Sequence, residues 1–376
     1  MRPLLVSLLL ALSPALLAQQ PAFPIPPAIA ARAYLLLDFN SEQLLVAHNP
    51  QQRVEPASLT KLMTAYITFT ALKQKLIRPE QVVPVSESAR RAEGSRMFIE
   101  PGKPVTVDEL VRGMVVQSGN DACIALAETI AGSEEAFVQM MNREAQRLGL
   151  KSTQFVNATG LPHPQHYSTA HDLALLAAAI IRDFPEYYPL YSQREYRYNN
   201  ITQANRNRLL WTDPTVDGMK TGYTENAGYC LITSARRGDR RLLSVVLGTA
   251  SEAVRAAESQ KLLNYGFQLY DGVRLYSGNQ PVATLQVFKG SANSVKAGFL
   301  TDLHLALPKG QSEKLNATIE SLRPLLAPIS VGQRVGTMKL TLDGKPFREL
   351  PVVALENVPV AGIFGRGWDT LRLLFR

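Results

Sequence analysis

A hydroxyl and a primary amine lie three residues apart at Ser58 and Lys61, where a helix is predicted to begin. Pro56 suits the first helical turn because its missing N–H would have no partner there, and the stretch 57–77 is rich in helix formers. Residues i and i+3 lie on one side of a helix, so the two side chains should project together. A desolvated lysine beside other cations can act as the base that activates a serine. A lone S-x-x-K pair is usually only a helix start with a surface lysine, so the rest of the sequence must decide.

Two further triplets could complete a serine–lysine site. The triplet S-G-N at 118–120 lies between the predicted helices 106–117 and 122–131, where side chains can point into a cleft. The triplet K-T-G at 220–222 lies just before the predicted strand 229–235. S-x-x-K, S-D-N and K-T-G, in this order, form the signature of class A β-lactamases and penicillin-binding proteins. The second triplet here departs from that signature only at its middle residue.

The chain resembles the D-alanyl-D-alanine carboxypeptidases, which are low-molecular-mass penicillin-binding proteins of the bacterial periplasm. The resemblance runs through SGNDAC at 118–123, VDGMKTG at 216–222 and AESQKLL at 257–263, and it covers essentially the whole chain after residue 18. It implies an α+β fold of the penicilloyl-serine transferase (β-lactamase/transpeptidase-like) type, in which a helical cluster packs against an antiparallel sheet. A small all-β domain and a C-terminal amphipathic helix are expected to follow.

The resemblance also implies a mechanism. Ser58 attacks the carbonyl between the two terminal D-alanines of a peptidoglycan stem pentapeptide, Lys61 is the base, and Ser118 passes a proton toward the leaving D-alanine. The backbone N–H groups of Ser58 and Tyr223 form the oxyanion hole, so a tyrosine at the place of a histidine seen in some relatives is tolerated. Water then releases the acyl-enzyme, and no metal or organic cofactor is needed. β-Lactam antibiotics should inhibit the protein covalently by acylating Ser58.

Substrate-binding residues are implied in the same way. Asn120 holds the substrate amide, and Thr221 binds the terminal carboxylate. Lys220 supplies a positive charge that helps keep Lys61 neutral by repulsion. Arg255 corresponds to a carboxylate-binding arginine of the family, although the sequence alone would make it a surface residue at a helix start. The implied substrate-binding set is Asn120, Lys220, Thr221, Gly222 and Arg255.

The hydrophobic pattern places helices in the middle of the catalytic region and strands on either side of them. The predicted strands are 33–38, 44–48, 229–235 and 242–248, and the predicted helices are 57–77, 106–117, 122–131, 134–148, 169–183 and 252–267. After about residue 270, short apolar runs alternate with turn residues, which is typical of a small all-β domain. The predicted organisation is a signal peptide at 1–18, a catalytic domain at 26–270, a β-rich domain at 276–361 and a membrane-anchor helix at 362–376.

The tail at 363–376 has an amphipathic pattern. On a helical wheel Phe364, Trp368 and Leu371 fall opposite Arg366 and Arg372, which suits the plane of a membrane interface. The alternative is a terminal helix docked on the protein's own core, but the intervening β domain favours the membrane. Together with the signal peptide, the tail predicts a periplasmic protein attached peripherally to the outer face of the inner (cytoplasmic) membrane.

The composition of the chain limits the classes of molecule that it is expected to bind. A formal net charge of +8 and a pI near 9.4 suit an anionic partner, and no basic tract, zinc-finger spacing or aromatic RNA-binding signature indicates nucleic acid. His163, His166 and His171 are not spaced as a helical metal-ligand pair, so no metal site is predicted. Cys123 and Cys230 could form a disulfide in an oxidising compartment, but buried free thiols are the preferred interpretation.

Three other functions stay open on the same motifs. A β-lactamase of class A deacylates with a glutamate acting through water, but the sequence has no glutamate between Asn157 and Glu186. A DD-endopeptidase would use the same fold on cross-links, although the β domain and the amphipathic tail make it less favoured. A non-catalytic wall-binding scaffold would predict disrupted motifs, whereas all three are intact.

Overall fold

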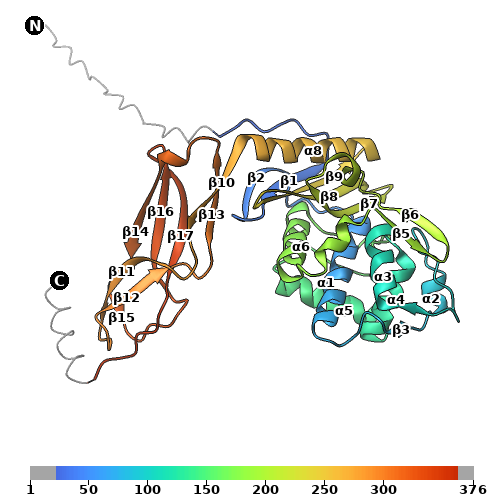
Figure 1. Ribbon diagram of the computed structural model, residues 1–376, viewed down its shortest axis with the longest axis horizontal. Coiled ribbons are helices and arrows are strands. Elements are labelled where there is room, and N and C mark those ends of the chain that lie inside the picture. Colours follow the sequence, from blue (N-terminus) through green and yellow to red (C-terminus); the bar gives the residue numbers. More distant parts are fainter. Residues whose placement is uncertain (1–22, 363–376) are drawn as a thin grey trace, which may run out of the picture. The chain divides into compact units, whose positions relative to one another are not determined.

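The computed structural model describes residues 23–362. The chain divides into two compact units (Figure 1), and each contains buried hydrophobic side chains. The α+β unit comprises Ile25–Val273 and His304–Lys309, and the β-rich unit comprises Arg274–Leu303 and the chain from Gly310 onward. No helix within residues 23–362 has the length and apolarity that a membrane crossing requires. The predicted signal peptide at 1–18 and the anchor helix at 363–376 lie outside the described residues.

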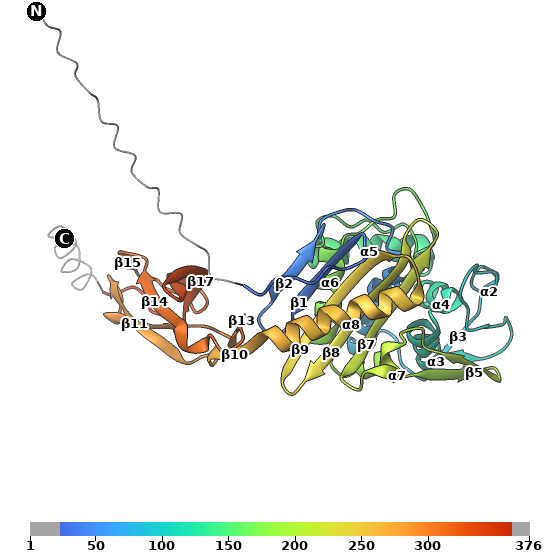
Figure 2. The ribbon, with the colours of Figure 1, turned by 90° about the horizontal axis from the view of Figure 1, so that it is seen from above.

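A five-stranded antiparallel sheet is the central layer of the α+β unit, with strand order β2-β1-β9-β8-β7. Its strands are β1 (Ala33–Asp38), β2 (Gln43–His48), β7 (Val216–Thr224), β8 (Gly228–Arg237) and β9 (Arg240–Thr249). Side chains alternate between the two faces of a strand. In β9, Leu243 and Val245 therefore pack into the helical core, whereas Leu242 and Val246 pack beneath α8 (Glu252–Leu269). Figure 2 shows α8 lying over β8 and β9.

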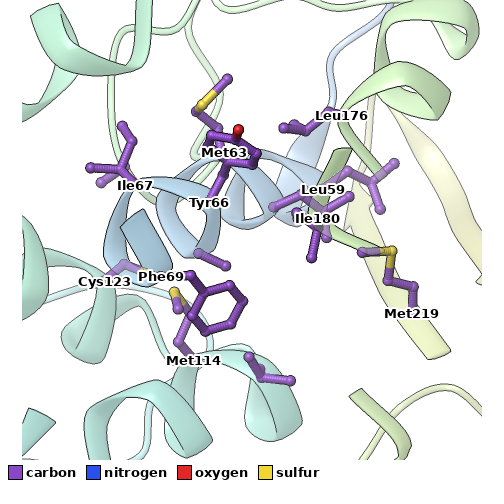
Figure 3. Close-up of a cluster of buried hydrophobic side chains, with 14 of the residues drawn as sticks. Leu59, Met63, Tyr66, Ile67, Phe69, Met114, Cys123, Leu176, Ile180 and Met219 are labelled. Carbon is purple, nitrogen blue, oxygen red and sulfur yellow. The ribbon is translucent and has the colours of Figure 1, made fainter. Parts of the chain in front are cut away.

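The helical layer is built around α1 (Lys61–Lys73), which follows directly on the 3-10 turn η1 (Ala57–Thr60). Residues 61–69 of α1 are all buried, so this part of the helix is enclosed by the rest of the unit and has no exposed face. In Figure 3, Phe69 lies on the same side of α1 as Met114 and Cys123, whereas Met63 lies on the opposite side, and all of them belong to one buried cluster. The predicted single helix 57–77 was therefore wrong at both ends, because the chain begins as 3-10 and leaves the helix before Lys75, which has a φ of 59°.

Four more helices surround α1. The predicted helix 106–117 is divided: α3 (Val107–Arg112) passes into the π-helical turn η2 (Gly113–Gln117), which stops at Ser118 in a left-handed conformation with φ 67°. The next three follow the predicted ranges closely and are α4 (Asn120–Ala131), α5 (Glu134–Arg147) and α6 (Ala170–Asp183). Side chains of Thr106, Ser133 and Thr169 accept hydrogen bonds at the starts of α3, α5 and α6.

Several elements were missing from the sequence prediction. The K-T-G triplet does not precede a strand but lies inside β7, the strand at one edge of the sheet. A hairpin of β5 (Glu195–Tyr198) and β6 (Ile201–Ala204) also went unpredicted. The shorter elements of this unit are β3 (Val82–Val83), α2 (Glu87–Arg90), β4 (Val105–Thr106), η3 (Tyr188–Ser192) and α7 (Leu209–Thr212).

The β-rich unit contains a six-stranded sheet in the order β14-β16-β17-β12-β11-β15. Its elements are β11 (Pro281–Phe288), β12 (Ser294–Gly298), η4 (Ser312–Lys314), β14 (Leu315–Ser321), β15 (Leu325–Leu326), β16 (Arg334–Leu342) and β17 (Lys345–Ala354). A separate two-stranded sheet joins β10 (Tyr270–Tyr276) to β13 (Leu303–Pro308), and residues 270–273 and 304–308 of these strands belong to the α+β unit. In β16 the alternate residues Met338, Leu340 and Leu342 are buried, as expected for a strand with one face on a core.

Candidate active site

Ser58 and Lys61 are in direct contact. The Nζ atom of Lys61 donates a hydrogen bond of 3.0 Å to the Oγ atom of Ser58. Ser58 lies in the 3-10 turn and Lys61 is the first residue of α1, so the junction of the two elements fixes their relative position. The side chain of Lys61 runs into the core and is only 1% exposed. The serine is thus at the surface of a cavity, and the amine lies beneath it.

A tight turn on the other side of Lys61 supplies its second partner. The Nζ atom donates a 2.6 Å hydrogen bond to the carbonyl oxygen of Thr159. Asn157 holds that turn, because its Oδ1 atom accepts from the N–H groups of Thr159 and Gly160 at 3.2 and 2.7 Å. Gly160 has a φ of +88°, and a Cβ atom there would overlap the carbonyl oxygen of Ala57. The turn therefore packs against the backbone that carries the serine.

Ser118 and Lys220 form a second hydroxyl–amine pair. The Nζ atom of Lys220 donates to the Oγ atom of Ser118 at 2.9 Å and to the carbonyl oxygen of Thr221 at 2.9 Å. Ser118 ends the π-helical turn in its left-handed conformation, and Lys220 is only 3% exposed within β7. The structure thus brings together two serine–lysine pairs that are far apart in the sequence.

The environment of the two amines disfavours their charged forms. Burial lowers the pKa of Lys61 from its usual 10.5 to about 8. Burial first, and then the nearby charges of Lys61 and Arg206, lower the pKa of Lys220 well below its usual value. The protein surroundings therefore disfavour the positive charge that the sequence assigned to Lys220. A negatively charged ligand would make that charge favourable again.

A cavity of about 440 Å³ connects these groups with the edge of the sheet. Thr221, Gly222 and Tyr223 of β7 form one wall, and Asn120 and Ser95 lie in the lining as well. The Nδ2 atom of Asn120 donates to the carbonyl oxygen of Glu93 at 2.6 Å, while its buried Oδ1 atom has no partner among the described residues. The complete lining is Ser58, Gly94, Ser95, Ser118, Asn120, Thr159, Gly160, Leu161, Arg206, Thr221, Gly222, Tyr223, Thr224, Tyr229, Glu252 and Arg255.

Arg255 lies in this lining and is not the surface residue that sequence reasoning alone suggested. It is 3% exposed, and its guanidinium lies 5.5 Å from the ring centroid of Tyr229. Its Nη1 atom donates to the carbonyl oxygen of Gly222 at 3.5 Å, and Glu252 lies 3.4 Å from Nη2. The rings of Tyr223 and Tyr229 are in contact, with centroids 4.3 Å apart and planes tilted by 33°. All the site residues inferred from the sequence thus line the cavity or lie directly beneath it.

Nine of the sixteen lining residues were not inferred from the sequence as site residues, and Thr159 and Arg206 are among them. Thr159 contributes its backbone oxygen, and the N-x-T-G pattern around it could have indicated a turn but not a partner for Lys61. Arg206 follows the β5–β6 hairpin and brings a second guanidinium to the cavity. Nothing in its local sequence, which is rich in arginine and asparagine, distinguishes it from a solvent-exposed loop residue. Only the folded chain reveals its position.

The other reactive side chains do not form a metal site. Residues 23–362 contain no group of three potential metal ligands. His166 is buried, its Nε2 atom is 2.8 Å from the Oγ1 atom of Thr60, and burial lowers its pKa to about 4. Cys123 and Cys230 are free buried thiols. Burial raises the pKa of Cys123 to about 12, so neither its position nor its protonation suits a nucleophile.

Known proteins share both the sequence and the fold. Residues 19–251 match the family described as D-alanyl-D-alanine carboxypeptidase, and residues 270–360 match the C-terminal domain of penicillin-binding protein 5. The D-alanyl-D-alanine carboxypeptidase DacC of Escherichia coli (strain K12) is 42% identical over 93% of this chain and 89% of its own length. These matches cover both compact units.

Solved structures agree with these matches. Penicillin-binding protein 5 of Haemophilus influenzae has a TM-score of 0.86 and 42% identity, and the match covers 89% of this chain and 99% of that one. Penicillin-binding protein D2 of Listeria monocytogenes, in an ampicillin-bound form, has a TM-score of 0.60 and 29% identity over 65% of this chain and 100% of that one. The predicted fold class and enzyme class are confirmed, and carboxypeptidase is supported over the endopeptidase, β-lactamase and scaffold alternatives. The chain belongs to the S11 peptidase family of serine-type D-alanyl-D-alanine carboxypeptidases.

Proposed function

We propose that Ser58 is the nucleophile that removes the terminal D-alanine from peptidoglycan stem pentapeptides. The observation that carries the proposal is the 3.0 Å hydrogen bond between the Oγ atom of Ser58 and the buried amine of Lys61. In its neutral form Lys61 accepts the serine proton as Oγ attacks the carbonyl carbon between the two D-alanines. The pKa of about 8 makes that neutral form accessible near neutral pH.

The second pair completes the acylation step. Ser118 relays a proton to the nitrogen of the departing D-alanine, so the C–N bond breaks as the ester to Ser58 forms. Lys220 donates to Ser118 at 2.9 Å and thereby orients its hydroxyl. The N–H groups of Ser58 and Tyr223 stabilise the oxyanion, which the packing of Gly222 against Pro56 and Ala57 supports. Water then attacks the ester and frees Ser58.

The substrate is recognised through two of its groups, the negatively charged terminal carboxylate and an amide of its backbone. The terminal carboxylate of D-Ala-D-Ala binds at Thr221, where Lys220 and Arg255 converge. An opposite charge favours the ammonium form, so the bound carboxylate raises the lowered pKa of Lys220. Repulsion from that ammonium then favours neutral Lys61. The unpartnered Oδ1 atom of Asn120 is available to accept the substrate amide N–H.

β-Lactams should acylate the same serine. The ampicillin-bound form of the Listeria protein, on the same fold, supports this proposal. The strained lactam amide takes the place of the D-Ala-D-Ala bond, so the same hydroxyl and base act on it. The absence of a glutamate between Asn157 and Glu186 in the sequence supports slow hydrolysis of the resulting ester.

Release of D-alanine from a synthetic stem pentapeptide tests the assignment. Wild-type protein should release one D-alanine per peptide, and Ser58→Ala should lower kcat/KM by roughly 10⁴-fold or more. Fluorescent penicillin should label wild type and not Ser58→Ala. The matched control is Ser192→Ala, because Ser192 lies outside the cavity lining and bonds only a nearby carbonyl. D-Alanine release by Ser58→Ala at the wild-type rate would refute the nucleophile.

The proposal extends to the protein's location in the periplasm, at the outer face of the inner membrane. The signal-peptide pattern at 1–18 and the amphipathic pattern at 363–376 support it. Deletion of 363–376 should release the protein from membrane vesicles and leave turnover of a soluble peptide unchanged. Trp368→Glu should weaken vesicle binding in part, whereas Lys314→Glu, at an exposed position of the β-rich unit, is the charge-change control. Full membrane retention after the deletion would refute the anchor.

A further inference from the structure

A second cavity in the α+β unit is lined by three arginines and an aromatic ring. It has a volume of about 400 Å³, and its lining begins at Arg90, the last residue of α2. Its lining residues are Arg90, Arg91, Arg96, Phe98, Ile99 and Glu100. None of them belongs to the lining of the catalytic cavity, and the mechanism proposed above uses none of them.

Two consecutive residues belong to the linings of the two different cavities. Ser95 lines the catalytic cavity and Arg96 lines the second one, and consecutive Cα atoms are about 3.8 Å apart. The N–H group of Asn120 donates to the carbonyl oxygen of Ser95 at 2.6 Å, so the start of α4 holds this dividing segment. The two linings are therefore separated by no more than one residue along the backbone at this point.

The floor of the second cavity is fixed before any ligand arrives. The carboxylate of Asp121 accepts from the N–H groups of Met97, Phe98 and Ile99 at 3.0, 2.7 and 3.2 Å. Phe98 is held with a φ of +70°, a conformation that is unfavourable for a residue with a side chain. The hairpin adds a hydrogen bond from Gln203 to the carbonyl oxygen of Arg96 at 3.2 Å. Binding there would need little loop ordering, which is a major cost of association.

The charges of this cavity are not balanced. Arg90 and Arg91 share one carboxylate, that of Glu87, at 3.3 Å each. The acidic group in the lining, Glu100, is paired with Lys103 at 2.8 Å. Arg96 lies 5.2 Å from the ring centroid of Phe98 and forms no ion pair with an acidic side chain in the described part of the chain. The cavity therefore has free capacity for an anion, because its three arginines outnumber the one carboxylate that pairs with them.

We propose that this arginine pocket (Arg90, Arg91, Arg96 and Phe98) binds a carboxylate of the stem peptide on the amino side of D-Ala-D-Ala. The inference rests on the proposed function, because it needs the D-Ala-D-Ala end in the catalytic cavity. A planar guanidinium matches a carboxylate with two parallel hydrogen bonds, and a ring beside it covers the methylene groups that lead to that carboxylate. The pocket is a specificity subsite for acidic peptides.

Matched peptides measure the subsite directly. The probes end in Lys-D-Ala-D-Ala and carry either glutamate or glutamine at one of the two preceding positions. Wild type should show a kcat/KM about tenfold higher for the best glutamate peptide than for its glutamine partner, as one charge-assisted pair provides. Arg96→Gln should bring this ratio close to one. Arg96→Lys should keep part of this preference for glutamate, because the positive charge remains while the two parallel hydrogen bonds of the guanidinium are lost.

Two controls separate a subsite from general charge effects. Arg143→Gln removes a cation from an exposed position of α5 and should keep the wild-type ratio. Raising the salt concentration should lower the ratio, because the arginines are partly exposed. A wild-type ratio of one at both positions, or equal loss in Arg96→Gln and Arg143→Gln, would overturn the subsite. Failure of every probe to release D-alanine would instead overturn the proposed function.

Discussion

The two compact units differ in what they bury. In the α+β unit, ionisable side chains such as Lys61, Lys220 and Arg255 are almost completely removed from solvent. Within residues 274–362 the buried side chains are hydrophobic, as Leu340 and Leu342 of β16 illustrate, and no charged or polar residue is buried there. The first unit thus breaks the usual rule for protein interiors, and the second follows it.

That difference has a physical cause. A buried amine loses its hydration, and the fold recovers only part of the cost through hydrogen bonds such as those of Lys61 to Ser58 and Thr159. Desolvation by burial is the largest cause of the lowered pKa of Lys61, so the reactive form of this amine depends on its burial. Burial of its amines therefore lowers the folding stability of the α+β unit while it makes the amines reactive. The β-rich unit buries no charged side chain within the described residues and carries no such cost.

Replacing the base should show both consequences of burial most strongly. Lys61→Met should lower kcat/KM for D-alanine release by roughly a thousandfold, the usual worth of a general base. At pH 7 the same variant should be more stable to unfolding by about 2 kcal/mol, because the cost of the lowered pKa disappears and exceeds the lost hydrogen bonds. Peptide turnover and urea unfolding measure the two effects.

Lys73→Met is the matched control, since Lys73 is the exposed last residue of the same helix. It should leave kcat/KM unchanged and alter stability by no more than about 0.5 kcal/mol. Wild-type activity in Lys61→Met would show that the buried amine is not needed for catalysis. A clearly lower stability of this variant at pH 7 would show that burial of the amine does not destabilise the fold.

The turn beneath the serine offers a second way to test the comparison. Gly160→Ala should lower kcat/KM and the rate of penicillin acylation by roughly 10- to 100-fold, because the new Cβ atom displaces the backbone of Ala57 next to Ser58. Gly149→Ala is the control, since Gly149 has a similar φ of +75° but open space around its Cα. The control should lose only the strain energy of about 1 kcal/mol and keep its activity. Equal activity of the two variants would contradict the proposed packing.

The pH dependence of acylation should be smaller but specific. The proposed base, Lys61, can accept a proton only when its amine is neutral, so the acylation rate should rise through pH 8 and increase about tenfold between pH 7 and pH 9. Stopped-flow acylation by a fluorescent penicillin measures this profile. A flat profile across that range would exclude Lys61 as the titrating base.

Stability should follow the same group with a definite sign. The pKa of Lys61 is lower in the folded state than the usual 10.5, so between pH 8 and 10.5 the unfolded chain binds the extra proton. The stability of wild type relative to Lys61→Met should therefore rise with pH across that window. A difference that stays constant would show that the amine is not desolvated.

The sequence predicted the regular parts of the fold well and the functional irregularities poorly. Helices such as α5 and α6 carry ordinary caps and one apolar face, so their ranges were close to the observed ones. β7 was missed because Gly218, Lys220 and Gly222 give it weak strand propensity and no apolar alternation. Polar residues of β7, Lys220 among them, line the candidate site or lie beneath it. A prediction based on the alternation of apolar residues therefore does not detect this strand.

The site itself was predictable through its motifs and not through its geometry. Spacing alone suggested Ser58 and Lys61, but the burial of Arg255 followed only from the family resemblance and then from the fold. Thr159 and Arg206 reach the cavity from turns with no periodic signal. Residues that are brought together by long-range contacts leave no trace in the local pattern.

The β-rich unit should give the smallest effect on catalysis and a large one on stability. Leu340→Ala removes a buried side chain from β16, so unfolding of this unit should become easier by about 2–5 kcal/mol. Turnover of a soluble pentapeptide at 25 °C should stay within about twofold of wild type, because none of the cavity-lining residues lies in this unit. Calorimetry and D-alanine release measure the two quantities, and Leu340→Met, which nearly conserves volume, should change both only slightly. Loss of activity in Leu340→Ala, with calorimetry showing a folded protein, would contradict the independence of catalysis from the β-rich unit. The apolar core of that unit would then support catalysis as well as the fold.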